Sequence, residues 1–157
     1  MILPVNVGLI LPPLRAEGQS GFFPFLLPSF NELEKARGAS WSTGRARQNQ
    51  YNVLKRKFQD DVVMFARRQF RPVPGPVVVI VEWREPTNYR DPDGIASGGK
   101  KILLDGLGPS RKGAKGWNGA EILHCDGRHC VCGFVDVVRT DPQRPGVVVT
   151  IAEVDRG

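Results

Sequence analysis

Two aspartates, Asp91 and Asp93, stand two residues apart, shortly after a strongly apolar run with the character of a β-strand. If the chain stays extended at the end of that strand, both carboxylates project to the same side. Oxygen ligands of this kind select hard divalent cations such as Mg²⁺ or Mn²⁺. A basic residue precedes the pair and two lysines follow it, and a hard cation beside cationic side chains suits phosphodiester chemistry. Asp-Pro-Asp-Gly is also a good turn sequence, so the pair alone is equally consistent with a structural turn.

A third carboxylate, Asp126, heads an Asp-Gly turn just before a second segment of strand character. If the sheet brings this turn beside Asp91 and Asp93, the three carboxylates repel one another unless a cation neutralises them. We therefore expect these three aspartates to hold Mg²⁺, with Mn²⁺ able to substitute. Lys101 lies four residues before Asp105, on the same helix face. It would supply positive charge where the phosphate becomes more anionic in the transition state.

The formal net charge of +6 is concentrated in one part of the chain. Residues 41–72 hold eight basic and two acidic residues, whereas the chain from residue 91 onward has nine of each. A localised basic segment predicts a surface that faces a polyanion such as DNA, although a solvated helix face is the alternative. Trp117, in a basic loop, is a candidate to stack on unpaired bases. The predicted phosphate contacts are Arg90, Lys100, Arg111, Lys112 and Lys115.

Hydrophobic spacing predicts the elements that would position these residues. In the first half, we expect a strand over 5–11, an apolar, proline-interrupted loop over 14–30 and an amphipathic helix over 45–70, whose outer face is basic. In the second half, we expect a strand over 77–84 buried on both faces, a helix over 95–107, a basic loop over 108–119, and strands over 129–139 and 146–154. The turn at 141–146 indicates a hairpin between the last two strands.

The length of 157 residues and the mixed elements predict one α/β (α+β) domain over residues 1–157. We expect a mixed β-sheet packed with two main helices, and a dimer interface that uses apolar surface of the first half. No apolar run approaches the roughly 20 residues that a membrane helix needs. The start of the chain lacks the basic region of a signal peptide. These features favour a cytoplasmic protein without a membrane partner.

The three cysteines, Cys125, Cys130 and Cys132, lie within eight residues of one another. An odd number at this spacing is not a disulfide framework and suits a reducing compartment. Together with His124 and His129 they could hold zinc, but the spacing differs from the paired C-x₂-C pattern of common zinc fingers. The simpler interpretation places Cys130 and Cys132 on one strand face as small core residues, and His129 as a partly buried strand residue. A zinc-stabilised adaptor remains an alternative.

Several motifs together resemble a known family. A D-x-D pair at Asp91 and Asp93 is followed by a lysine with an aspartate four residues later, Lys101 and Asp105, and then by the Asp-Gly turn at Asp126. Further matching stretches are Pro28-Ser29-Phe30-Asn31-Glu32, Gly133-Phe134, Asp136 and residues 141–145.

This pattern resembles the RusA family of Holliday-junction resolvases, closest to its prophage-borne branch, over about residues 26–154. The resemblance implies a RusA-like homodimer that acts in DNA recombination and repair in a bacterial or phage-infected cell. It implies an Mg²⁺-dependent endonuclease that binds four-way DNA junctions and nicks two strands of like polarity. Its site residues would be Asp91, Asp93 and Asp126 as metal ligands, and Lys101.

The chain also departs from the family pattern. Gly94 replaces an asparagine, Cys125 replaces an acidic residue, the spacing from Asp93 to Lys101 is longer, and the loop over 108–119 is longer and more basic. These differences leave a second hypothesis open, a catalytically weakened or inactive protein of the same fold that binds branched DNA without cleaving it.

Overall fold

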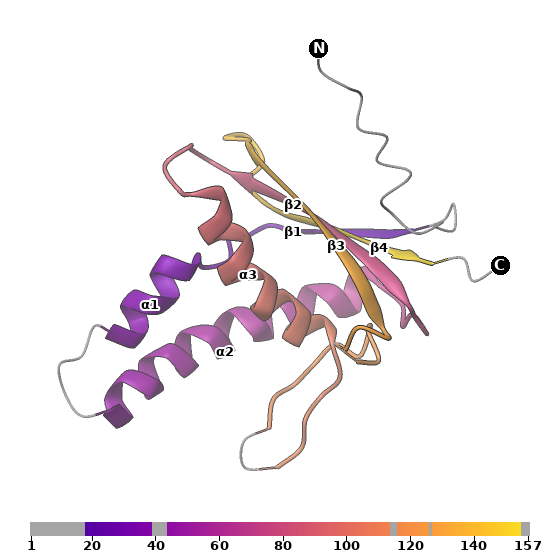
Figure 1. Ribbon diagram of the computed structural model, residues 1–157, viewed down its shortest axis with the longest axis horizontal. Coiled ribbons are helices and arrows are strands. Elements are labelled where there is room, and N and C mark those ends of the chain that lie inside the picture. Colours follow the sequence, from indigo (N-terminus) through magenta and orange to yellow (C-terminus); the bar gives the residue numbers. More distant parts are fainter. Residues whose placement is uncertain (1–17, 39–43, 114–115, 126, 155–157) are drawn as a thin grey trace.

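The computed structural model describes residues 18–38, 44–113, 116–125 and 127–154 (Figure 1). A four-stranded mixed sheet and three helices follow one another along this part of the chain. This confirms the predicted mixed α and β class, with one more helix than expected. The elements are β1 (Gln19–Phe23), α1 (Phe30–Gly38), α2 (Gly44–Gln69), β2 (Val77–Glu85), α3 (Pro92–Leu107), β3 (Val131–Thr140) and β4 (Gly146–Glu153). The strand predicted over 5–11 lies outside the described residues.

The strand order is β1-β4-β2-β3. Strands β2 and β3 are parallel, and α3 forms the crossover between them, whereas β4 is antiparallel to both β2 and β1. The hairpin predicted between β3 and β4 is therefore wrong, because β2 lies between these strands. Thr140 and Gly146 flank the carboxyl end of β2, opposite Glu85 and Arg84, so the turn carries the chain across that end.

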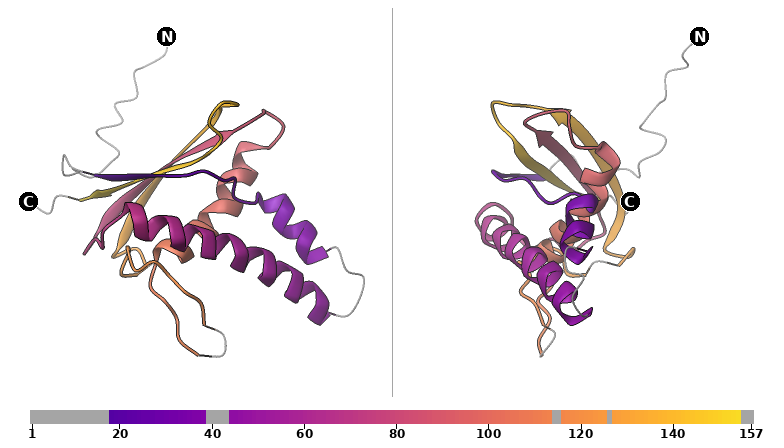
Figure 2. Two further views of the ribbon diagram at one scale, coloured as in Figure 1. Left: turned by 180° about the vertical axis from the view of Figure 1, so that it is seen from behind. Right: turned by 90° about the vertical axis from the view of Figure 1, so that its left-hand side faces the viewer.

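All three helices lie on one side of the sheet (Figures 1 and 2). Val77, Val79, Val81 and Trp83 of β2 are buried, and Ile80 between them is only half-buried. The prediction that this strand is buried on both faces therefore holds only at its start, where Val78 is also fully buried. The alternation further along β2 is what one covered and one open sheet face produce.

The predicted loop over 14–30 contains β1, which is a correction to the sequence analysis. Phe23 is fully buried and lies opposite Val147 of β4, so the apolar run is explained by sheet pairing and core packing. A proline follows Phe23 and cannot donate a ladder hydrogen bond, which limits the strand to five residues.

Helix α1 was not predicted, although its start carries a sequence signal. The Ser29 amide donates to the Glu32 carboxylate at 2.6 Å, and the Glu32 amide donates to the Ser29 hydroxyl at 3.4 Å. This reciprocal pair is a capping box, which satisfies amide groups at a helix start. The serine and glutamate of the Pro28–Glu32 motif thus have a structural role.

Two adjacent glycines allow α3 to approach its neighbours closely. A Cβ atom on Gly98 would lie 2.3 Å from the Phe30 amide nitrogen, and one on Gly99 would lie 2.6 Å from the Trp83 ring. Glycine lowers helix propensity at both positions, but any larger residue would push α3 away from α1 and from the sheet.

Within the described residues, no helix combines the length and apolar character needed to cross a membrane.

Candidate active site at the start of helix α3

Asp91 and Asp93 lie at the amino-terminal end of α3. Asp91 is the N-cap residue, and its side chain accepts a hydrogen bond from the Gly94 amide at 3.4 Å. Pro92 occupies the first turn, where its missing amide hydrogen costs nothing. The pair was expected on extended chain, but Asp93 is already helical. Because the helix dipole is positive at this end, it stabilises both carboxylates.

Both aspartates are exposed, and no ion pair joins either of them to a basic side chain of the described residues. Their oxygens are therefore open to an external cation. Gly94 leaves room for a side chain: a Cβ there would meet only Asp91, at 3.7 Å.

Arg90 precedes this pair but has a structural position. One of its terminal nitrogens donates to both carboxylate oxygens of Glu85 at 3.1 and 3.0 Å. The other donates to the Leu27 carbonyl at 2.6 Å and to Glu32 at 3.0 Å. Arg90 thus joins the end of β2 to the start of α1, which argues against the predicted phosphate contact because both terminal nitrogens already have acceptors.

These contacts affect the pKa of the Glu32 carboxyl. Burial by itself would raise the pKa of its carboxyl, but the hydrogen bonds from Ser29 and the charge of Arg90 together outweigh burial. The pKa of Glu32 is therefore held below its ordinary value of 4.5.

Both lysines of α3 also have acidic partners. Lys100 forms an ion pair with Asp136, which in turn accepts a hydrogen bond from the Trp83 indole at 3.0 Å. Lys101 pairs with Asp105 at 2.9 Å, and Lys55 of α2 pairs with the other oxygen of Asp105 at 2.7 Å. Asp105 is only 6% exposed, so the two lysines neutralise a buried carboxylate between α2 and α3.

Lys101 does not lie beside the aspartate pair. Eight residues of helix separate it from Asp93, a rise of about 12 Å along the axis. The position one turn from Asp93 is taken by Ser97, whose hydroxyl donates to the Asp93 carbonyl at 2.7 Å. Within one chain, the structure therefore separates the predicted lysine from the carboxylates that it was expected to assist.

Asp126 lies outside the described residues. Its neighbours Cys125 and Gly127 are described. Gly127 accepts hydrogen bonds from the Cys130 and Val131 amides at 2.9 Å, and the Cys130 carbonyl accepts from Val77 at 2.7 Å. These bonds place the turn at the amino end of β2. The aspartate pair follows the carboxyl end, and β2 is about 26 Å long at the usual strand rise.

The basic loop after α3 folds against α2 and forms a pocket with it. Gln59 of α2 donates to the Asn118 carbonyl at 3.1 Å, and Arg67 donates to the Gly119 carbonyl at 3.0 Å. The pocket measures about 310 Å³. Its lining is formed by Arg56, Gln59, Asp60, Arg111, Gly113, Gly116, Trp117 and Asn118.

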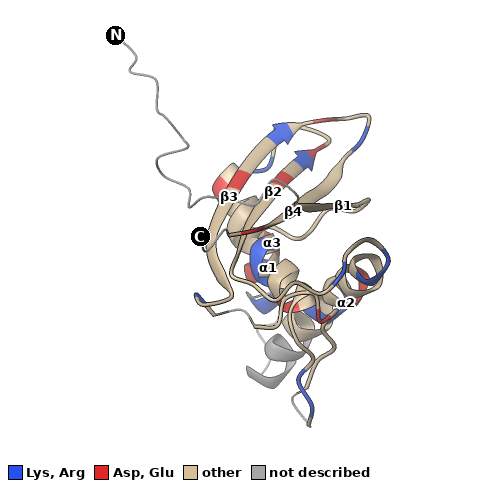
Figure 3. Ribbon diagram, turned by 90° about the vertical axis from the view of Figure 1, so that its right-hand side faces the viewer, with Lys and Arg blue, Asp and Glu red and all other residues tan. Residues whose placement is uncertain are grey.

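The pocket brings together basic residues that are far apart in the sequence. Arg56 from α2 and Arg111 from the loop both line it, and the Arg111 guanidinium lies 5.3 Å from the centre of the Trp117 ring. Figure 3 shows the basic positions of α2 and of this loop. Lys112 is exposed beside the pocket lining, and Lys115 lies outside the described residues. The sequence carries no local signal for Gln59 or Asn118, because the contact between them depends on how the loop packs against α2.

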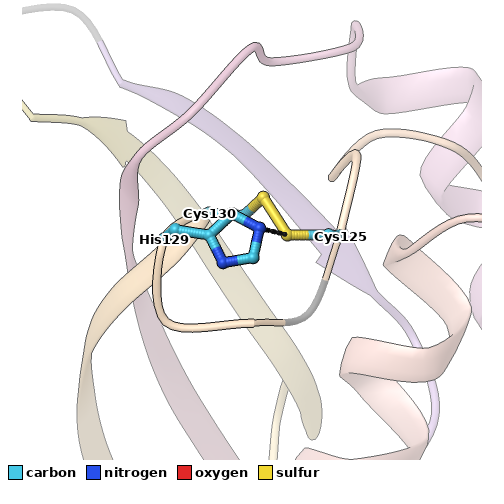
Figure 4. Close-up of a disulfide and its surroundings, with 3 residues drawn as sticks. All are labelled: Cys125, His129 and Cys130. Carbon is cyan, nitrogen blue, oxygen red and sulfur yellow. Dashed lines mark hydrogen bonds between the residues drawn. A yellow bond between two sulfur atoms is a disulfide. The ribbon is translucent and has the colours of Figure 1, made fainter.

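The cysteines contradict the expectation of reduced thiols. Cys125 and Cys130 form a disulfide, and Cys132 is a free, exposed cysteine (Figure 4). Cys130 is buried, as predicted, but it precedes β3 and does not share a buried strand face with Cys132. His129 is exposed in the turn, so its predicted place as a partly buried strand residue is also wrong.

Trp83 is 1% exposed and belongs to the core, and Trp41 lies outside the described residues.

Comparison of the chain with protein-family models, with curated proteins and with solved structures finds no match.

Proposed function

We propose that this chain is an Mg²⁺-dependent endonuclease that cleaves branched DNA, specifically four-way junctions, as a homodimer. The observation that carries the proposal is the exposed pair Asp91 and Asp93 at the start of α3, which has no cationic partner among the described residues. The chain is basic, yet no cationic side chain of the described residues pairs with either of these two carboxylates, which suits binding of a hard cation together with an anionic substrate.

The two carboxylates fit part of an Mg²⁺ site. Both groups are acceptor-only oxygens at an exposed position, and Mg²⁺ usually keeps several waters beside one or two carboxylates. When bound, the ion would polarise the scissile phosphate and activate a water molecule. Asp91 would keep its orientation through the hydrogen bond from the Gly94 amide at 3.4 Å.

If Asp126 is the third carboxylate, we expect it to come from a second subunit. The residues that flank Asp126 lie at the amino end of β2, whereas Asp91 and Asp93 follow its carboxyl end. We therefore propose that the partner subunit's Asp126 completes the site. A two-fold dimer would then carry two such sites, which matches two symmetric nicks in a four-way junction.

The pocket between α2 and the loop after α3 supports the DNA-binding part of the proposal. Arg56 and Arg111 would neutralise phosphates there, and the Trp117 ring would provide apolar surface for a base. The loop starts where α3 ends, so it lies about 24 Å from the aspartate pair of the same chain, the length of a 16-residue helix. A junction that contacts both regions must therefore extend along the protein.

The test is cleavage of a synthetic four-way junction in Mg²⁺ or Mn²⁺, with a linear duplex of the same sequences as control. We expect paired nicks in the junction, none in the duplex, and none with Asp93→Asn, which should still bind the junction. Nicking by Asp93→Asn would exclude the proposed site. Junction binding by the wild type without nicking in either metal would favour the second hypothesis, a non-catalytic DNA-binding protein. The loss of the family asparagine at Gly94 and the distance of Lys101 from the pair are the observations that favour that hypothesis.

A further inference from the structure

The turn before β3 gathers two sulfur atoms and an imidazole. The ligand atoms of Cys125, His129 and Cys130 all lie within 4.8 Å of one another. The two cysteines form a disulfide, and the His129 Nε2 atom lies 3.2 Å from the Cys125 sulfur (Figure 4). Thiolates and imidazole are the donors that zinc takes in proteins.

We propose that this turn is a redox-controlled zinc site. When the disulfide is reduced, Cys125, His129 and Cys130 bind one Zn²⁺, and water takes the fourth position. When the disulfide forms, the same two sulfur atoms are joined to each other and the ion is released. The metal and the disulfide exclude one another because they use the same sulfur electron pairs.

The backbone geometry suits both states. The Cα atoms of Cys125 and Cys130 are 5.8 Å apart. Tetrahedral zinc with Zn–S bonds of about 2.3 Å places two sulfur atoms roughly 3.8 Å apart. Cysteines at this Cα separation reach that spacing by side-chain rotation, so the main chain can keep its course.

The turn is held in place by the sheet rather than by the disulfide alone. The Gly127 carbonyl accepts from the Cys130 and Val131 amides, and the Cys130 carbonyl accepts from the Val77 amide of β2. Gly127 also leaves space for the imidazole, since a Cβ atom there would lie 2.9 Å from the His129 ring. These bonds persist when the sulfur–sulfur bond opens, so the ligands stay gathered, as a preorganised site requires.

The site is accessible to metal and to small thiols. His129 is exposed and Cys125 is half-buried, whereas Cys130 anchors the turn in the core at 4% exposure. Cys132 is two residues further on and contacts the Val77 carbonyl at 3.4 Å, away from the cluster. It therefore offers a matched control of the same residue type.

The chemical steps balance. Two molecules of a small thiol such as glutathione supply two electrons and two protons, which convert the disulfide into two thiols and leave glutathione disulfide. Zn²⁺ binding then displaces the two thiol protons. In the reverse direction, glutathione disulfide accepts two electrons from the two thiolates and two protons from water, which gives two glutathione molecules, and the zinc ion leaves.

The test uses the full chain without an affinity tag, reduced and then freed of reductant under inert gas. Co²⁺ serves as the spectroscopic probe, because thiolate ligation adds charge-transfer absorption in the near ultraviolet, and Zn²⁺ is then used to displace it. We expect the reduced protein to develop the thiolate band with one equivalent of Co²⁺, and the oxidised protein to show no such band. An equal band in both states, or no thiolate band in the reduced protein, would overturn the proposal.

Variants locate the ligands. Cys125→Ser should abolish the thiolate band, and Cys132→Ser should leave uptake unchanged. His129→Ala, at an exposed position that does not threaten folding, should weaken Zn²⁺ binding at least about tenfold, since even the loss of a supporting hydrogen bond costs about that much. Retained affinity in His129→Ala, or lost uptake in Cys132→Ser, would contradict the assignment.

A release experiment tests the redox control. Glutathione disulfide added to the zinc-loaded protein should liberate one Zn²⁺, followed with a chromogenic chelator, and retention of the ion would overturn the switch. None of these measurements involves DNA, so their outcome is independent of the proposed nuclease activity.

Discussion

One nitrogen of the Arg90 guanidinium donates to both carboxylate oxygens of Glu85, at 3.1 and 3.0 Å. The Glu85 side chain is only 5% exposed, so this contact compensates a buried charge at the end of β2. Arg90 also reaches α1 through Glu32, and Asp91 is the next residue. Because these contacts hold Arg90 in place, they also fix where the chain enters Asp91.

Arg90→Ala should lower the free energy of unfolding by roughly 3 kcal/mol, because it leaves the Glu85 carboxylate buried without a partner. Urea denaturation measures this loss. Glu85→Gln in the Arg90→Ala background should recover part of it, because the amide carries no charge. If Arg90→Ala instead left stability unchanged and weakened only DNA binding, Arg90 would be a phosphate contact after all.

Subunit complementation distinguishes a site shared between subunits from one built within a single chain. Asp93→Asn and Asp126→Asn homodimers should both be inactive on a four-way junction. A mixed dimer keeps one intact site only if Asp91 and Asp93 act with the partner subunit's Asp126. We therefore expect the mixture to regain single-strand nicking after subunit exchange. Continued inactivity, with subunit exchange verified by mass, would have one of two meanings. Either the three carboxylates act within a single chain, or they do not form the active site.

Arg56 and Arg111 line the same pocket, so their loss should act together on DNA binding. Arg56→Gln with Arg111→Gln should weaken binding and reduce the slope of log affinity against log salt by up to about two, since each phosphate contact contributes roughly 0.9. Arg144→Gln is the control. Arg144 lies in the turn before β4, where its guanidinium contacts the Phe22 ring of β1, and it does not line this pocket. An unchanged slope in the double variant would place the DNA surface elsewhere.

Gly94→Asn tests the main departure from the resolvase pattern. A Cβ at this position meets only ordinary contacts, so the substitution should fold normally. If the amide orients Asp93 or a metal-bound water, junction nicking should rise about tenfold or more, the size of effect that supporting groups have at metal sites. Gly94→Ala adds the Cβ without the amide and should leave the rate unchanged. An equal response to both variants would mean that the amide has no such role.

The lowered pKa of Glu32 predicts a pH-dependent contribution to stability. Between the folded pKa and the unfolded value of 4.5, the unfolded state binds more protons, so stability rises with pH. The contribution is complete above 4.5 and is lost as the pH falls through the folded pKa. Comparison of thermal midpoints of the wild type and Glu32→Gln across this window should show a difference that shrinks on acidification. A constant difference would argue against the ionic role of Glu32.

The spacing of apolar residues in the sequence was sufficient to predict helices and strands that are defined by contacts within one segment. The apolar spacing around Phe58 and Val62 predicted helix α2 within one residue at each end, and the run from Val77 predicted strand β2. Each of these inferences depends on contacts repeated every turn or every second residue, which one segment contains in full.

The tertiary structure decided which distant segments meet. Only the three-dimensional structure shows that β2 separates β3 from β4, that Lys55 and Lys101 share Asp105, and that the flanks of Asp126 lie at the far end of β2 from Asp91. The metal triad itself stays a prediction, because Asp126 lies outside the described residues. Pairing between remote segments depends on how the whole chain packs its apolar surface, and no short stretch of sequence contains that information.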